Sequence, residues 1–326
     1  MPKRLSAADY TAGILAGSRT VLGRAITLVE STLPADHGLA QEVLQAVLPH
    51  TGRSLRVGIT GVPGVGKSTF IEALGRYLVE TKGLKLAVLA VDPSSQRGGG
   101  SILGDKTRMP WLSAHPAAFI RPSPAGGSLG GVARATREAL LLCEAAGHDI
   151  IFVETVGVGQ SETTVHGMVD FFLLLMLAGA GDELQGLKRG IMEMADALCI
   201  TKADHGNEQA ARRARLDYQS ALHLFPPAPS GQVQPVLLTS AVSGSGLAEV
   251  WEVIEQYAAA TRQNGYFARR RQQQQQQWLH HSIAQALEAR FYADAAVRER
   301  LPAVRAAVAA GQLTPFAAAE ELLGLR

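Results

Sequence analysis

The stretch that most constrains this chain runs from Gly61 to Ser68. It reads G-V-P-G-V-G-K-S, the pattern G-x-x-x-x-G-K-[ST], and it lies between the apolar segment LRVGIT and a segment with apolar residues at helical spacing. Glycines let the backbone wrap so that its N–H groups point at phosphate oxygens. Lys67 offers a positive charge to the β- and γ-phosphates, and Ser68 offers a hydroxyl to Mg²⁺. We therefore expect a strand, a phosphate-binding loop and a helix whose N-terminus adds further N–H groups.

The whole chain divides into three parts by its pattern of apolar residues. Residues 1–52 are predicted to be a helical N-terminal extension, residues 53–262 a domain of alternating strands and helices, and residues 263–326 a helical C-terminal arm. Strands that are apolar on both faces, with helices between them, indicate an α/β fold with a mostly parallel sheet covered by helices on both faces. Together with the phosphate loop, this pattern predicts a P-loop NTPase. The expected strands are Leu55–Thr60, Leu86–Val91, Ala118–Arg121, Ile150–Glu154, Phe171–Leu177, Ala197–Thr201 and Val236–Thr239.

The C-terminal arm opens with an unusual polar run. Arg269, Arg270 and Arg271 are followed by six glutamines, residues 272–277. Such a run is either a disordered tract or the exposed part of a long helix. Apolar residues recur at helical spacing directly after it, and this favours the helix.

Composition and charge exclude several other classes of protein. The chain has 326 residues, 47% of them apolar, and a formal net charge of +2. This balance gives no reason to expect a nucleic-acid or membrane partner. The two cysteines, Cys143 and Cys199, form no CxxC pattern, and the apolar run 171–178 is too short to span a bilayer. We expect a cytoplasmic protein.

Acidic residues at strand ends are the expected partners of a Mg²⁺–nucleotide site. Asp92 ends one predicted strand, Asp105 lies in a glycine-rich stretch, and Glu154 ends the strand IIFVE. Ser68, Asp92, Asp105 and Glu154 are the predicted metal ligands, direct or through water. Gly157 follows Glu154 at the spacing of a glycine whose N–H meets the γ-phosphate. Lys67, Glu154 and Gly157 are therefore candidate catalytic residues.

The base that the site accepts is predicted from the segment Thr201-Lys202-Ala203-Asp204. The Asp204 carboxylate can accept from guanine N1–H and N2–H₂, a donor pair that adenine lacks, and the Lys202 stem can cover the base. Thr201 occupies the position of an Asn, which suggests GTP with a weakened affinity. The pair Ser240-Ala241 is expected to offer a backbone N–H to guanine O6. The predicted nucleotide-binding residues are Gly61, Val62, Pro63, Gly64, Val65, Gly66, Lys67, Ser68, Thr69, Thr201, Lys202, Asp204, Ser240, Ala241 and Val242.

Several longer strings resemble the MeaB/ArgK family, GTPase chaperones of adenosylcobalamin-dependent methylmalonyl-CoA mutase. They are GITGVPGVGKST, AVDPSSQRGGGSILGDKTRM, FIRPSP, LGGVARATRE, VETVGVGQSE and LAGAGDELQGLKRGI. These strings are far longer than generic motifs and span nearly the whole of residues 53–262. One departure concerns Thr201, where the family usually has Asn.

The resemblance implies a function and a set of partners. Such a protein hydrolyses GTP to GDP and phosphate, gates the loading of adenosylcobalamin and protects the mutase, or a closely related acyl-CoA mutase. It forms a homodimer largely through the arm at residues 263–326. Its switch loops would correspond to residues 92–108, 154–163 and 179–189. In the third of these loops, Lys188 is a candidate catalytic residue that acts when the partner docks.

Three alternatives stay open at this point. A metallochaperone GTPase for nickel or zinc would carry clustered His or Cys ligands, but the nine histidines are scattered, and His280 and His281 fall on different faces of a predicted helix. A P-loop kinase would transfer the phosphoryl group to an acceptor other than water. A GTP-sensing scaffold would bind the nucleotide without turning it over.

Overall fold

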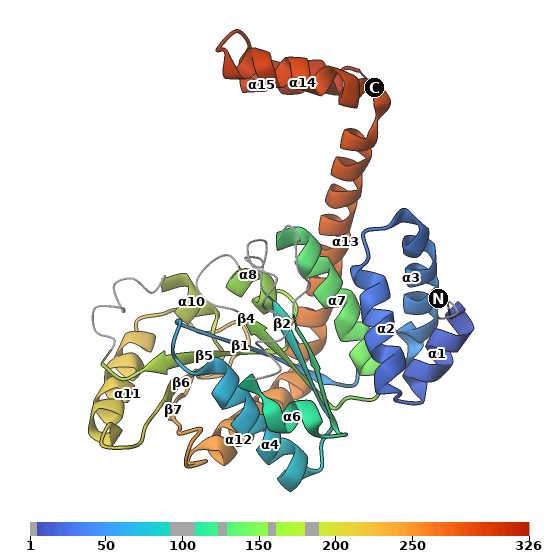
Figure 1. The fold of residues 1–326 in the computed structure, drawn as a ribbon. Helices are drawn as coiled ribbons and strands as arrows, with labels where there is room; N and C mark the ends of the chain where they lie inside the picture. Colours follow the sequence, from blue (N-terminus) through green and yellow to red (C-terminus); the bar gives the residue numbers. More distant parts are fainter. Residues whose placement is uncertain (1–4, 92–107, 123–128, 156–160, 180–188, 326) are drawn as a thin grey trace. The chain divides into compact units, whose positions relative to one another are not determined.

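The computed structural model describes residues 5–91, 108–122, 129–155, 161–179 and 189–325, and the statements below concern these residues (Figure 1). By their internal packing they form two compact units, Met1–Arg271 and Gln272–Arg326, which are described separately. The domain boundaries predicted at residues 52 and 262 remain predictions. Among the described helices, none is long and apolar enough to cross a membrane.

A seven-stranded sheet forms the centre of the first unit, and all of its strand pairs are parallel. The strand order is β3-β2-β4-β1-β5-β6-β7. The predicted parallel sheet is confirmed, and β1, whose end carries the phosphate loop, lies at its middle between β4 and β5. The strands are β1 (Leu55–Gly61), β2 (Leu86–Val91), β3 (Ala118–Arg121), β4 (Ile150–Thr155), β5 (Phe171–Leu177), β6 (Ala197–Thr201) and β7 (Val236–Leu238).

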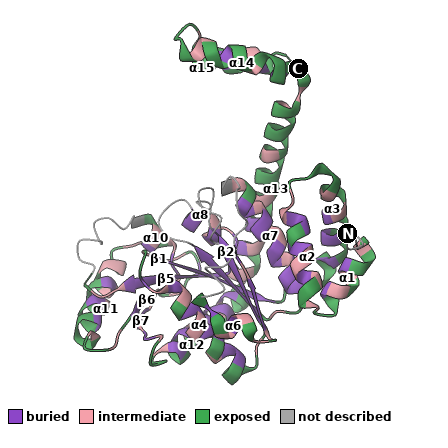
Figure 2. Ribbon diagram, viewed as in Figure 1, coloured by how far each residue is buried: buried purple, intermediate pink, exposed green. Residues whose placement is uncertain are grey.

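Helices cover both faces of this sheet, as the apolar strands predicted. α4 (Lys67–Lys82), α6 (Pro110–Ala114) and α12 (Leu247–Gln263) lie on one face, where their apolar residues share a core with Val57 and Phe152. Figure 2 shows the strands as an almost continuous buried layer. Strands that are buried on both faces explain why their sequences are apolar without alternation.

Four of the described helices cover the second face. α7 (Leu129–Ala145) and α8 (Ser161–His166) contact the strands β1, β2 and β4. α10 (Arg189–Met194) and α11 (Glu208–Leu222) pack on the other half of the sheet, around Leu174 and Ile200. The long apolar run at residues 171–178 is thereby accounted for, because β5 is a central strand of the sheet.

The N-terminal extension is helical, as its spacing predicted. It contains α1 (Ala7–Leu15), α2 (Arg19–Glu30), α3 (Pro34–Val47) and a 3₁₀ turn at Leu48–His50. The Ser6 hydroxyl accepts from the backbone N–H of Asp9 and the Asp9 carboxylate accepts from the N–H of Ser6, a capping box that fixes the start of α1. α2 packs along α7, so these helices belong to the same unit as the sheet.

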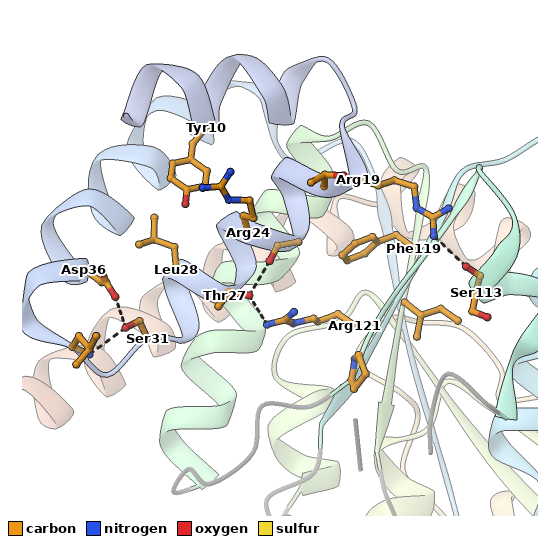
Figure 3. Close-up of a pocket in the computed structure, with 15 residues that line it drawn as sticks. Tyr10, Arg19, Arg24, Thr27, Leu28, Ser31, Asp36, Ser113, Phe119 and Arg121 are labelled. Atoms are coloured by element: carbon orange, nitrogen blue, oxygen red, sulfur yellow. Dashed lines mark hydrogen bonds between the residues drawn. The ribbon is translucent and has the colours of Figure 1, made fainter. Parts of the chain in front are cut away.

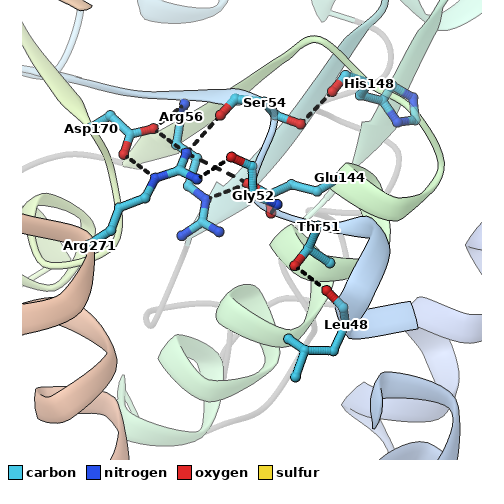
Figure 4. Close-up of polar contacts among 9 residues, drawn as sticks. All are labelled: Leu48, Thr51, Gly52, Ser54, Arg56, Glu144, His148, Asp170 and Arg271. Carbon is cyan, nitrogen blue, oxygen red and sulfur yellow. Dashed lines mark hydrogen bonds and ion pairs between the residues drawn. The ribbon is translucent and has the colours of Figure 1, made fainter. Parts of the chain in front are cut away.

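The beginning of α13 (Tyr266–Ala293) is fixed by buried charge pairs (Figure 4). The Arg271 guanidinium donates to both carboxylate oxygens of Asp170, each at 2.7 Å, and to the carbonyl oxygen of Gly52 at 2.9 Å. Beside it, Arg56 donates to Glu144 at 2.8 Å, and the Arg56 backbone N–H donates to Asp170. The arginine run therefore anchors this helix where the strands begin.

The second unit is entirely helical. Residues 272–277 continue α13, so the helical interpretation of the glutamine run is confirmed. α14 (Ala295–Ala309) and α15 (Pro315–Leu323) pack on each other around Val304, Ala318 and Leu322.

Candidate nucleotide-binding site

The phosphate loop has the backbone conformation that its glycines permit. β1 ends at Gly61, which has φ of +155°, and a Cβ atom at this position would lie 2.5 Å from the carbonyl oxygen of Leu175. Gly66 has φ of +92° and directly precedes the first residue of α4. The strand, loop and helix expected around the motif are present, so the loop wraps around the N-terminus of α4.

Lys67 lies within the loop that it is expected to serve. Its ammonium group donates to the carbonyl oxygens of Gly61 at 2.9 Å and Val62 at 3.3 Å, and the residue is 9% exposed. Burial lowers the pKa of Lys67, and the carboxylates of Glu154 and Glu162 act in the opposite direction. The result is a fixed cation at the end of β1, held in place by the loop itself.

Glu154 faces the first turn of α4. In the sheet register, Glu154 lies beside Ile59 of β1, and the Ser68 hydroxyl donates to the Glu154 carboxylate at 3.2 Å. Behind them, Thr155 donates to Thr60 at 2.8 Å and ties β4 to β1. A hydroxyl and a carboxylate at this distance are the oxygen donors that Mg²⁺ prefers.

Glu162 is a residue of this site that sequence reasoning missed. It lies in the first turn of α8, is 2% exposed, and its charge acts on Lys67. The sequence feature that could have identified Glu162 is its position: it is an acidic residue at the start of a helix, directly after the glycine-rich stretch that follows Glu154. Four predicted site residues lie outside the described residues: Asp92, Asp105, Gly157 and Lys188.

The end of β6 is tied directly to the phosphate loop. The Thr201 hydroxyl donates to the carbonyl oxygen of Val65 at 2.7 Å, and a second contact to Met176 is 3.3 Å. The Lys202 ammonium donates to the carbonyl oxygen of Gly64 at 2.9 Å. Thr201 and Lys202 thus bind the phosphate loop to the end of β6. The Thr201 hydroxyl therefore already has a hydrogen-bond partner within the protein.

Asp204 and Ser240 meet at the ends of β6 and β7. The Ser240 hydroxyl donates to the Asp204 carboxylate, and the N–H of Ala203 donates to the carbonyl oxygen of Thr239 at 3.0 Å. Ser240 is buried, Ala241 is half-buried and Val242 is 74% exposed. The structure therefore brings the two predicted base-binding segments together beside the phosphate loop.

A parallel sheet, a phosphate loop with its buried lysine, and the segment Lys202–Asp204, whose Asp204 carboxylate accepts from Ser240, are together typical of a P-loop GTPase. The family model described as "Methylmalonyl Co-A mutase-associated GTPase MeaB" matches residues 22–296, and the chain belongs to this family. It binds guanine nucleotide and is a GTPase, in agreement with the description of the family.

Two relatives and one solved structure illustrate the similarity. The chain is 47% identical over 278 residues to "GTPase ArgK" of Escherichia coli, covering 85% of this chain and 84% of the relative. It is 47% identical over 324 residues to "Methylmalonic aciduria type A homolog, mitochondrial" of Mus musculus, covering 96% and 78%. The solved structure described as "LAO/AO transport system kinase" is 37% identical with a TM-score of 0.77, covering 100% of this chain and 99% of that one.

Proposed function

We propose that this GTPase is a chaperone that gates the loading of adenosylcobalamin and protects methylmalonyl-CoA mutase or a closely related acyl-CoA mutase. The observation that carries the proposal is the family match over residues 22–296, whose description names the mutase. The name of the mouse relative, which refers to methylmalonic aciduria, agrees with it. We further propose that the protein acts in the cytoplasm, without a nucleic-acid or membrane partner.

The residues of the site have distinct proposed roles in GTP hydrolysis. Lys67 neutralises charge that develops between the β- and γ-phosphates while water attacks in line. Ser68 and Glu154 would hold Mg²⁺, which supplies further positive charge at the phosphates when it is bound. Asp92 and Asp105 are further proposed metal ligands, Gly157 a proposed donor to the γ-phosphate, and Lys188 a proposed group that acts when the mutase docks.

Base selection is proposed to rest on Asp204. Its carboxylate would accept from guanine N1–H and N2–H₂, with the Lys202 stem over the base and the N–H of Ala241 near O6. The bond from Ser240 to Asp204 supports this role because it orients the carboxylate.

The proposal is tested by capturing the partner and measuring hydrolysis. The full chain, loaded with a non-hydrolysable GTP analogue, is used to capture proteins from native extract, and GTPase assays follow with the captured mutase. We expect an adenosylcobalamin-dependent mutase in the capture and a faster GTP turnover in its presence. Lys67→Ala should abolish turnover. Absence of the mutase together with an unchanged rate would contradict the chaperone role.

Two other functions make different predictions. The solved relative is described as a transport system kinase, and this is a reason to test for phosphoryl transfer. Labelled phosphate on an acceptor, instead of free phosphate, would indicate a kinase. A nickel or zinc metallochaperone would need a cluster of ligands. No group of three or more His, Cys, Asp or Glu residues that could hold a metal ion occurs among the described residues.

A further inference from the structure

The short helix α6 is bound to the phosphate-loop helix α4 by one carboxylate. One oxygen of Glu72 accepts from the backbone N–H of Trp111 at 2.7 Å, and the other accepts from that of Leu112 at 3.2 Å. Glu72 lies four residues after Ser68 on α4, about 6 Å farther along the helix axis. The contact therefore joins α6 to the turn of α4 that follows the proposed metal ligand Ser68.

Glu72 satisfies donors that α6 cannot satisfy by itself. The N–H groups in the first turn of a helix have no acceptor within that helix. Pro110, the first residue of α6, has no N–H, and Met109 before it makes no side-chain capping bond. The first turn therefore depends on Glu72, which accepts from both Trp111 and Leu112.

Apolar packing brings the same two helices close together (Figure 1). Met109 and Leu112 are 1% and 0% exposed and belong to the core that α4 shares. A Cβ atom at Gly75 of α4 would lie only 2.8 Å from a methyl carbon of Leu112. The Arg76 guanidinium lies over the Trp111 ring, 5.5 Å from its centroid. The polar contact of Glu72 is thus part of a close fit between α4 and α6.

The opposite end of α6 is held by the N-terminal helices (Figure 3). Arg19 of α2 donates to the carbonyl oxygens of His115 at 3.0 Å and Ser113 at 3.3 Å. The His115 ring also stacks on the Trp111 ring, with 4.6 Å between the centroids. Because Arg19 serves the C-terminal end, Glu72 is the polar contact at the end where the preceding segment enters α6.

This preceding segment, residues 92–107, lies outside the described residues, but the elements on both sides of it are described. The strand β2 precedes it, and in the sheet register Ala90 of β2 lies beside Glu154. Asp105, a proposed metal ligand, comes five residues before Pro110 and so lies within about 18 Å of it along any path of the chain. The position of α6 therefore limits how far Asp105 can be from α4.

We propose that Glu72 is a positioning residue for the Mg²⁺–nucleotide site. By binding the first turn of α6 to α4, it keeps Asp105 within reach of the Mg²⁺ that Ser68 and Glu154 would hold. Both oxygens of Glu72 are engaged by backbone N–H groups, so it acts through α6 and does not itself ligate the metal. The inference rests on the metal-binding roles proposed above for Ser68, Asp105 and Glu154.

The test compares binding of a non-hydrolysable GTP analogue to the full chain in Mg²⁺ and in EDTA, by calorimetric titration. Glu72→Gln keeps one acceptor oxygen and should weaken binding in Mg²⁺ about threefold, and Glu72→Ala, which keeps none, about tenfold. In EDTA both variants should bind as the wild type does, because the phosphate loop is unchanged. GTP turnover in Mg²⁺ should fall in the same order.

Glu80→Gln is the matched control, because it makes the same change about two turns farther along α4. Glu80 pairs at the surface with Arg76 at 2.9 Å, and its variant should bind the analogue as the wild type does in both solutions. If the Glu72 variants bind more weakly by the same factor in Mg²⁺ and in EDTA, Glu72 supports the fold only and the proposal is overturned.

Two further outcomes separate this inference from the proposals on which it rests. A wild type that binds the analogue equally in Mg²⁺ and in EDTA would overturn the proposed metal ligands and the role of Glu72 with them. A wild type that binds more tightly in Mg²⁺, with Glu72 variants that match it in both solutions, would overturn the role of Glu72 alone. The mutase is absent from these measurements, so their result does not depend on the chaperone role.

Discussion

Thr201 stands where guanine-specific loops usually carry Asn, and its hydroxyl has a structural partner. The bond of 2.7 Å to the Val65 carbonyl joins β6 to the phosphate loop. Thr201→Val keeps the shape and removes the donor, so we expect the dissociation constant for GDP to rise about fivefold to tenfold, the effect of one buried hydrogen bond of roughly 1 kcal/mol. Thr201→Ser keeps the hydroxyl and should bind nearly as the wild type does. Equal affinities of the Val and Ser variants, measured by calorimetry, would show that this bond does not organise the loop.

His166 gives the fold a dependence on pH. Burial, with a contribution from the positive charge of Arg270, lowers the pKa of His166 from 6.5 to about 3. The unfolded chain therefore binds a proton below pH 6.5 that the folded chain does not bind, and stability falls as the pH falls through this range.

The expected effect is large enough to measure by urea unfolding. From about pH 7.5 to about pH 5.5, His166 should remove about 1.4 kcal/mol of the free energy of unfolding. His166→Phe keeps an aromatic ring against Phe172, which His166 contacts edge-on at 5.6 Å between centroids, and removes the titration. Over the same pH interval, the free energy of unfolding of the wild type should therefore fall by about 1.4 kcal/mol more than that of this variant. Equal losses in the two proteins would exclude His166 as the cause.

At the scale of elements, the sequence predicted the strands well. Each strand lies within one residue of its predicted range, because a strand buried on both faces must be apolar throughout and its ends are marked by glycine or polar residues. The phosphate loop could also be predicted from the sequence, because its backbone requires glycines at fixed spacing. The strand-loop-helix arrangement of the site therefore follows from local sequence.

The contacts that complete the site could not be predicted in this way. Thr201 and Val65 are 136 residues apart, and Arg271 and Asp170 are 101 residues apart. Glu162 approaches Lys67 only because α8 follows β4, which lies beside β1 in the sheet. Periodicity reports which face of an element is buried, but pairing between polar side chains depends on how the elements are arranged. These pairs became visible only with the strand order.

Within the arginine run at the beginning of α13, neighbouring arginines differ in whether they have a buried ionic partner. Arg271 is bound to Asp170, whose side chain is 2% exposed, whereas Arg269 donates to the Asn264 carbonyl at the surface. Arg271→Ala leaves a buried carboxylate without its partner and should lower the free energy of unfolding by about 3 kcal/mol. Arg269→Ala, two residues away on the same helix, should change it by less than about 0.5 kcal/mol. Urea unfolding of the two variants tests this, and equal effects would contradict an anchoring role for Arg271.

At the scale of the whole molecule, the C-terminal arm presents an apolar stripe on α13. Leu279, Ile283 and Leu287 follow one another at intervals of four residues and are 63%, 51% and 54% exposed. Residues at this spacing lie on one face of a helix. The sequence resemblance predicts a homodimer through this arm, and a stripe of three large apolar side chains is a suitable surface for a second copy of the chain.

Charge on the stripe should separate the two copies. Ile283→Glu would bury a carboxylate at the centre of the dimer interface, where no partner is expected, and should raise the dissociation constant of the dimer at least tenfold, about 1.4 kcal/mol. His281→Glu adds a charge to the opposite face of the same helix and should leave the dimer intact. Light scattering during gel filtration, over a range of concentrations, gives the mass of each variant. A wild-type monomer, or an Ile283→Glu dimer as stable as the wild type, would show that this stripe does not form the interface. If the prediction is confirmed, comparing GTP hydrolysis by the separated and paired forms will show whether dimerisation changes the rate at the phosphate loop.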